Sequence, residues 1–226
     1  MFVPPPAAVA PDVVRVGRTV AVTEAEGPGR RTALWVQGCT IRCAGCFNPH
    51  LWQARGGQLR PIDLLAAELL AEGEPHAVEG LTLLGGEPFE QAAPLAHLAT
   101  SFRERGLSVM TFTGYERRDL EKWAGARADI AALLDATDLL ADGPYLRDLP
   151  DTDRPWVGSR NQGLHALTAR YAEELEDFAR QPDRLEVRVA ADGAVSVNGW
   201  SDVASLETLL AGLGRRDDTV SRRADR

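Results

Sequence analysis

Residues 80–88 have the sequence Gly-Leu-Thr-Leu-Leu-Gly-Gly-Glu-Pro, a short apolar run followed at once by two glycines, an acid and a proline. The apolar run predicts a buried β-strand, and the Gly-Gly-Glu-Pro segment predicts that the strand ends in a tight loop. A helix is expected next, entered at Pro94, with Leu95, Leu98 and Phe102 on its inner face. Strand, loop and helix in this order are typical of a parallel α/β sheet.

The same unit recurs along the chain. Strands are expected at residues 13–22, 33–36, 80–84, 107–112 and 138–141, and helices after Pro61, after Pro94, at 118–123 and at 128–134. In parallel sheets with right-handed crossovers, functional residues gather at the carboxyl ends of the strands. Here those ends carry the least generic segments of the chain. The predicted fold class is therefore α/β with a largely parallel sheet.

Beyond Pro150 the pattern changes. An amphipathic helix is expected at 169–180, a hairpin at 185–189 and 194–198 turned at Asp192-Gly193, and a last helix at 202–210. We therefore expect four parts: a disordered tail at 1–12, a core domain at 13–180, a hairpin–helix extension at 181–213, and a second disordered tail at 214–226. The extension is either a docking element or an added layer on the sheet.

Composition excludes several classes of function. The chain has 226 residues and a net charge of −8, which argues against nucleic acid as its main partner. No segment approaches the ~20 consecutive apolar residues that span a bilayer, so no membrane partner is expected. Three closely spaced cysteines do not form a disulfide framework. Free thiols indicate a reducing compartment, and a cytoplasmic location is expected.

The three cysteines, Cys39, Cys43 and Cys46, lie on one loop just after the strand predicted at 33–36. Thiolates at spacings of four and three can converge on one soft metal centre. A structural zinc takes four ligands, and an electron-transfer iron–sulfur cluster usually takes four thiolates. Three cysteines therefore either leave one iron open for chemistry or belong to a zinc site that His50 completes.

Two motifs together resemble those of the radical S-adenosylmethionine enzymes. Cys39, Cys43 and Cys46 match the cluster motif of that superfamily, and residues 85–88 match its second signature. The resemblance implies a partial (βα) barrel and one 4Fe-4S cluster, whose fourth iron binds the amino and carboxylate groups of S-adenosylmethionine. It further implies that reduction of the cluster releases methionine and a 5′-deoxyadenosyl radical.

A finer resemblance extends from about Val16 to Tyr171. It is carried by residues 27–31, 37–39, 46–48, 113–115, 142–145 and 158–162. This set is similar to the activating proteins of anaerobic ribonucleoside-triphosphate reductase and to pyruvate formate-lyase activating enzymes. The resemblance implies an oxidoreductase that installs a glycyl radical on a partner enzyme, with flavodoxin or ferredoxin as the electron donor.

The resemblance also implies residue roles. Cys39, Cys43 and Cys46 would be the catalytic cluster ligands, and the residues that bind S-adenosylmethionine would be Gly45, Cys46, Phe47, Gly85, Gly86, Glu87, Thr113 and Asp142. Glycines allow the backbone to approach a ligand closely, and a glutamate accepts a charge-assisted hydrogen bond from an ammonium group. Asp142 is equally explained as a turn-forming aspartate. Trp52 is expected to cover the cysteine loop.

Several alternatives remain open from sequence. The same cofactor chemistry serves enzymes that act on a small heterocycle, as 7-carboxy-7-deazaguanine synthases do, or on a peptide. The lack of any further cysteine counts against peptide maturases with auxiliary clusters. Ser159, Asn161 and Gln162 either line a partner-facing cleft or form a hydrogen-bonded loop. The alternative that is not an enzyme is a non-catalytic zinc-binding module.

Overall fold

The computed structural model describes residues 3–5, 10–178, 180, 181, 184–189, 193, 195–199, 208 and 211. The strands are β1 (Val13–Thr23), β2 (Arg31–Val36), β3 (Gln58–Pro61), β4 (Gly80–Gly85), β5 (Ser108–Phe112), β6 (Leu139–Asp142), β7 (Gly163–Ala166), β8 (Leu185–Val189) and β9 (Val195–Gly199). The α-helices are α1 (Ile62–Gly73), α2 (Ala92–Arg103), α3 (Arg117–Ala124), α4 (Ala128–Asp135) and α5 (Leu175–Phe178). Short 3-10 turns are η1 (Pro49–Leu51), η2 (Glu74–His76), η3 (Pro88–Gln91) and η4 (Ala169–Tyr171).

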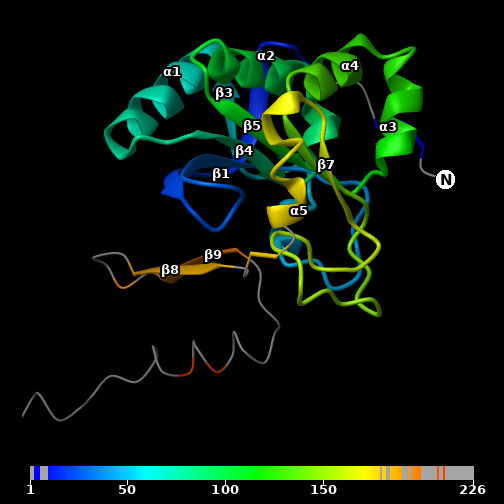
Figure 1. Ribbon diagram of the computed structural model, residues 1–226. Helices are drawn as coiled ribbons and strands as arrows, with labels where there is room; N and C mark the ends of the chain where they lie inside the picture. The colour runs from blue at the N-terminus through cyan, green and yellow to red at the C-terminus, as the bar shows by residue number, and fades with distance from the viewer. Residues whose placement is uncertain are drawn as a thin grey trace, which may run out of the picture.

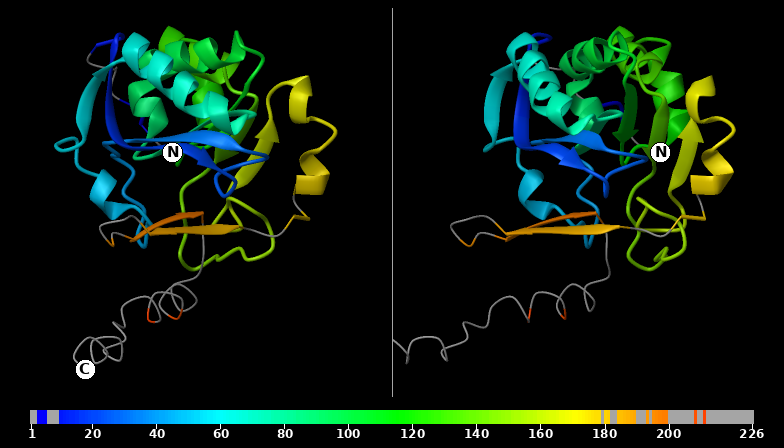
Figure 2. Two further views of the ribbon diagram at one scale, coloured as in Figure 1. Left: turned by 90° about the vertical axis from the view of Figure 1, so that its left-hand side faces the viewer. Right: turned by 60° about the vertical axis from the view of Figure 1, so that its left-hand side comes forward.

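Seven strands form one mixed sheet in the order β3-β1-β2-β4-β5-β6-β7. The pairs β2–β4, β4–β5 and β5–β6 are parallel, whereas β1, β3 and β7 join antiparallel. The α/β class and the parallel centre are thus confirmed, within a sheet whose flanks are antiparallel. Helices α1 to α4 cover one face of the sheet, and the separate hairpin β8–β9 lies on the other side (Figures 1 and 2).

The core forms between this helical layer and the sheet. The apolar pattern of α1 predicts an inner face of Ile62, Leu65, Leu69 and Leu70, of which the first three are buried and Leu70 is partly buried. They pack in one apolar cluster with the central strands and with the predicted inner face of α2 (Leu95, Leu98, Phe102). Helix α2 begins at Ala92, two residues before Pro94. Pro94 therefore lies in the first turn of the helix, where proline is tolerated. None of the described helices has the length and apolar character that crossing a membrane requires.

Two strands were not predicted, and one predicted helix is wrong. Strand β3 is a short edge strand, and β7 has only half-buried residues, so neither carries the apolar alternation of a strand. The helix expected at 169–180 is broken into η4 and α5. The break allows the Tyr171 hydroxyl to reach Ser108 while the Phe178 ring packs edge-on against the Tyr171 ring, with centroids 5.5 Å apart.

The predicted hairpin is confirmed as β8–β9, with Val187 paired to Val197. It forms its own two-stranded sheet and adds no strand to the main one. The expected helix at 202–210 and the expected tail at 214–226 lie outside the described residues, apart from Thr208. Much of the tail expected at 1–12 also lies outside them.

A fully buried arginine joins the amino-terminal ends of three parallel strands. The Arg31 guanidinium, on β2, donates from Nε to Thr82 Oγ1 (2.6 Å) and from Nη2 to the Leu81 carbonyl (2.6 Å), both on β4. From Nη1 it donates to Ser108 Oγ (2.9 Å), at the start of β5. All of its hydrogen-bond acceptors are neutral, and burial lowers the pKa of this guanidinium. The guanidinium charge is therefore stabilised by carbonyl and hydroxyl oxygens of the protein.

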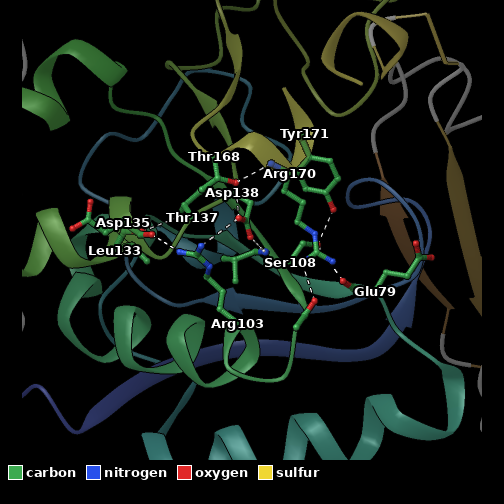
Figure 3. A network of polar contacts seen from close by, with 12 residues as sticks. Glu79, Arg103, Ser108, Leu133, Asp135, Thr137, Asp138, Thr168, Arg170 and Tyr171 are labelled. Atoms are coloured by element: carbon green, nitrogen blue, oxygen red, sulfur yellow. Dashed lines mark hydrogen bonds and ion pairs between the residues drawn. The ribbon is translucent and has the colours of Figure 1, made fainter. Parts of the chain in front are cut away.

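Further polar contacts continue this layer toward β6 (Figure 3). The Tyr171 hydroxyl donates to Ser108 Oγ at 2.7 Å, and Ser108 Oγ donates to the Glu79 carbonyl at 3.1 Å. Beside them, Asp138 accepts from the Val109 N–H (2.9 Å) and from the Thr168 hydroxyl (2.7 Å). The amino-terminal edge of the sheet is thus held by polar side chains, and its carboxyl edge is left for other loops.

Replacing Arg31 by methionine tests this layer. The substitution leaves buried carbonyl and hydroxyl acceptors without donors, so we expect the free energy of unfolding to fall by roughly 3–5 kcal/mol. Urea denaturation of the metal-free protein measures the change. The matched control, Arg30→Met, alters an exposed neighbour and should change stability by about 0.5 kcal/mol or less. Equal effects of the two substitutions would contradict the assignment.

Candidate functional site

The cysteine loop leaves the carboxyl end of β2 and is closed by its own backbone. The Cys39 N–H donates to the Trp52 carbonyl at 3.0 Å, and the Cys46 N–H donates to the Cys43 carbonyl at 3.0 Å. All three cysteines are half-buried and have free thiols. The closed loop therefore carries three free, half-buried thiols.

The Gly85-Gly86-Glu87 segment, at the end of β4, packs directly against the start of this loop. The Gly86 N–H donates to the Val36 carbonyl and the Glu87 N–H to the Gly38 carbonyl, both at 2.8 Å. A Cβ added at Gly86 would lie 2.1 Å from the Gly38 oxygen, so no other residue fits there. The glycines thus serve the close approach of two protein loops.

The Glu87 side chain joins the ends of β4 and β5. Its Oε1 accepts from the Phe89 N–H (2.9 Å) and from the Thr113 hydroxyl (2.8 Å), and its Oε2 accepts from the Gly114 N–H (2.8 Å). The residue is 1% exposed, and this burial raises the pKa of the carboxyl to about 8, although the three donors oppose the shift. The predicted residues Glu87 and Thr113 are therefore in direct contact.

Two adjoining cavities surround the cysteines. The first, of about 150 Å³, is lined by all three cysteines together with Trp52, Gly85, Gly86, Glu87, Thr113, Gly114, Tyr145 and Gln162, among others. The second, of about 350 Å³, shares Cys43, Cys46, Gly85, Tyr145 and Gln162 and adds Arg18, Glu26, Trp35, Gly45, Phe47, Trp156, Val197 and Gly199, among others. Every predicted cofactor-binding residue except Asp142 lines one of the two.

Asp142 has protein partners instead. Its Oδ2 accepts from the Arg117 N–H at the start of α3 (2.6 Å), and its Oδ1 contacts His165 Nε2 (3.0 Å) and the Gly163 N–H (3.1 Å). Burial alone would raise the pKa of Asp142, but these hydrogen bonds lower it below its ordinary value. The contacts match the alternative in which this aspartate stabilises the turn after β6.

The charge state of the thiols follows from their surroundings. Burial raises the pKa of Cys39 to about 12, helped by the nearby carboxylates of Glu87 and Glu90, and burial also raises the pKa of Cys43. Without a bound cation these thiols are therefore neutral at pH 7. A metal centre would reverse this, because a coordinated thiol is deprotonated outright.

The three cysteines are arranged differently from the ligands of a single metal ion. Among the described residues, no three His, Cys, Asp or Glu side chains are arranged around a single metal ion, so no preformed zinc site is present there. The cysteines of a 4Fe-4S cluster bind different iron atoms and need not converge on one point. Three free thiols on one loop, with Gly38 and Gly45 at positive φ, suit such a cluster.

Sequence reasoning missed the contribution of the hairpin. Glu186, on β8, accepts from the Glu24 N–H (2.6 Å) and the Thr23 hydroxyl (2.9 Å), and the Gly199 N–H donates to Glu26 (2.8 Å). These contacts place Val197 and Gly199 in the wall of the larger cavity. No local signal in the sequence pairs these acids with segments more than 160 residues away.

The predicted polar loop after residue 157 also reaches the site. Gln162 lines both cavities, while its side chain accepts from the Gly158 N–H (2.9 Å) and donates to the Gly143 carbonyl (3.1 Å). Ser159 is buried and its hydroxyl accepts from the Leu146 N–H (3.1 Å), and Asn161 donates to the Pro144 carbonyl (2.7 Å). These hydrogen bonds match the loop-stabilising alternative for Ser159 and Asn161, and Gln162 has both roles.

The raised pKa of Glu87 predicts a pH dependence of stability. Between pH 4.5 and pH 8 the unfolded chain loses this proton while the folded chain keeps it, so the free energy of unfolding falls as pH rises. Glu87→Gln removes the effect. Urea denaturation of the metal-free proteins across this window should give a wild-type curve that falls relative to the variant by up to about 1.4 kcal/mol per pH unit. Parallel curves would refute the shift.

Comparison with known proteins places the chain in a family. The profile of the 4Fe-4S single cluster domain matches residues 25–165. The chain is 33% identical over 146 residues to the anaerobic ribonucleoside-triphosphate reductase-activating protein of Enterobacteria phage T4, covering 63% of this chain and 87% of the relative. Proteins of the same name are 30% identical over 148 residues in Vibrio cholerae serotype O1 (63% and 91%) and 33% identical over 148 residues in Salmonella typhimurium (62% and 91%).

The matched segment contains the cysteine loop, β4, β5 and β6, which are the elements that build the site. The profile ends before β8, so the hairpin lies beyond it. The chain belongs to the 4Fe-4S single cluster domain family, together with the anaerobic ribonucleoside-triphosphate reductase-activating proteins.

Proposed function

We propose that this protein is a radical S-adenosylmethionine activase that installs a glycyl radical on a partner reductase. The observation that supports it most is the meeting of the cysteine loop with the Gly85-Gly86-Glu87 loop around one cavity. The likeness to activating proteins over most of their length agrees with this assignment. A small-heterocycle substrate has no comparable support.

In this proposal Cys39, Cys43 and Cys46 would hold a 4Fe-4S cluster beside the cavity in which S-adenosylmethionine would bind. With one electron from an external donor, the bound groups would supply the chemistry of a 5′-deoxyadenosyl radical, with release of methionine, for removal of a hydrogen atom from a backbone glycine of the partner. The protein's task is to orient these groups and to exclude water.

Glu87 is the residue proposed to receive the α-ammonium group of the methionyl part. Its carboxyl is buried, already oriented by Thr113 and Gly114, and faces the cavity of the cysteines. An adjacent cation favours its ionised form, so binding would release the proton that burial retains. Gly45 and Phe47 line the larger cavity, where they would contact the adenosyl part.

The remaining assignments follow from the same proposal. Flavodoxin or ferredoxin would supply the electron, and the protein would act in the cytoplasm. The strands β2, β4, β5 and β6 with their helices would form the partial barrel of a core domain at residues 13–180. Residues 181–213 would form an extension whose hairpin closes the substrate side of the larger cavity.

Replacement of one cysteine tests the cluster assignment. After anaerobic reconstitution with iron and sulfide, Cys43→Ala should lose the 4Fe-4S absorbance and the formation of 5′-deoxyadenosine from S-adenosylmethionine and dithionite together, because two thiolates do not hold the cluster in place. Iron analysis, absorption spectra and chromatography of the products measure this. Ala44→Ser, in the same loop, should keep both properties. A fully loaded wild-type protein that yields no 5′-deoxyadenosine would refute the enzymatic proposal.

The proposed role of Glu87 predicts a loss of ligand affinity. Glu87→Gln removes a charge-assisted hydrogen bond to the ammonium group, so the Kd of S-adenosylmethionine for the cluster-loaded protein should rise about tenfold or more. Equilibrium binding in the absence of a reductant measures it. Glu79→Gln, before the opposite end of β4, is the matched control and should leave the Kd unchanged. Unchanged affinity in Glu87→Gln would exclude this role.

A further inference from the structure

The indole of Trp52 carries an unexplained donor. Its Nε1 is buried and has no hydrogen-bond acceptor, and within the described part of the chain only one other buried side-chain polar atom, Asn198 Oδ1, lacks a partner. A buried N–H without an acceptor costs about 1–3 kcal/mol, and such groups are rare in native proteins. The acceptor is therefore expected to come from a bound group.

The position of Trp52 indicates which group. It follows η1 and lines the cavity of about 150 Å³ that the three cysteines share. Its carbonyl accepts the Cys39 N–H at 3.0 Å, and the adjacent Leu51 carbonyl accepts the Gly38 N–H at 2.8 Å. These two hydrogen bonds fix the tryptophan relative to the first cysteine of the loop.

Three polar side chains in the cavity wall already have hydrogen-bond partners within the protein. Both Glu87 oxygens accept hydrogen bonds, the Thr113 hydroxyl bonds to Glu87 and to the Tyr115 N–H, and the Gln162 oxygen accepts the Gly158 N–H. The cysteine sulfurs line the same cavity, and the Asn48 N–H already donates to Cys46 Sγ at 3.4 Å. A donor from this loop thus already contacts a cysteine sulfur.

We propose that the Trp52 indole N–H donates a hydrogen bond to a sulfur of the iron–sulfur cluster and thereby raises the reduction potential of that cluster. The inference rests on the proposed function, because it requires a cluster on Cys39, Cys43 and Cys46. Reduction by one electron adds negative charge to the cluster, and a hydrogen bond to sulfur stabilises the reduced state more than the oxidised one. The proton stays on the indole nitrogen throughout, so Trp52 is a positioning and tuning residue.

A redox titration of the reconstituted protein tests the proposal. Trp52→Phe keeps an aromatic ring and removes the donor, so the cluster should load fully and its midpoint potential should shift to a more negative value. The titration is followed by electron paramagnetic resonance in the absence of S-adenosylmethionine. The control is Trp123→Phe, which removes an indole buried in the helical layer against Tyr115 and should leave the potential unchanged. Equal potentials in Trp52→Phe and wild type would overturn the proposal.

A second measurement detects the contact itself, and its negative outcome in the wild-type protein does not depend on a variant. Wild-type protein labelled with ¹⁵N in its tryptophan rings should show a ¹⁵N hyperfine coupling to the reduced cluster, retained in Trp123→Phe and lost in Trp52→Phe. A wild-type spectrum without this coupling would overturn the proposal.

The alternative acceptor is the methionyl carboxylate of S-adenosylmethionine. That case predicts weaker binding of S-adenosylmethionine to Trp52→Phe with an unchanged potential, and it would also overturn the proposal. A wild-type protein that loads a cluster and shows the ¹⁵N coupling, yet does not cleave S-adenosylmethionine, would refute the proposed function alone.

Discussion

The register of four parallel strands is the constraint on which the rest of this structure depends. At the amino-terminal edge, the buried Arg31 guanidinium bonds β2 to β4 and β5 through neutral acceptors. At the opposite edge, the same register pairs Val36 with Gly85. The two loops that leave these residues therefore begin side by side, and backbone hydrogen bonds join them within three residues. Polar side chains join the strands at their amino-terminal ends, and the carboxyl ends of the strands carry the residues proposed for chemistry.

Most of the residues at the carboxyl ends of the parallel strands could be predicted, because the sequence signals that mark a strand end are local. A short apolar run that ends in glycine marks a strand end in the sequence, and parallel pairing brings such ends together. Elements that are held by contacts with residues distant in the sequence could not be predicted. Strand β7 lacks an apolar pattern and pairs with the free edge of β6, and the helix predicted at 169–180 is interrupted after Tyr171, whose hydroxyl bonds to Ser108. The hydrogen bonds that hold the hairpin, such as the one from the Glu24 N–H to the Glu186 carboxylate, have no local signal in the sequence.

The individual site residues show a similar division. The sequence predicts that Gly86 lets the backbone approach a ligand closely. In the structure this glycine has a different role, because the Gly38 carbonyl occupies the space where a side chain would lie. Asp142 looked equivalent to Thr113 in sequence, yet its oxygens bond to α3 and β7 while Thr113 contacts Glu87. Hydrogen-bond partners, and not residue type, separate the two. Burial raises the pKa of Cys39 and of Glu87, so binding of a cationic group beside them would favour the release of protons.

The placement of all three cysteines on one loop has a consequence for how the protein matures. No cysteine belongs to the apolar core or to a strand of the sheet, and the loop is closed by its own backbone hydrogen bonds. Small zinc domains, by contrast, are unfolded until metal arrives. Here the apolar core packs without any cysteine side chain, so the contacts of the core do not include the residues proposed to hold the cluster. The proposed metal centre would then be an addition to the folded scaffold, and its loss would leave the contacts of the core in place.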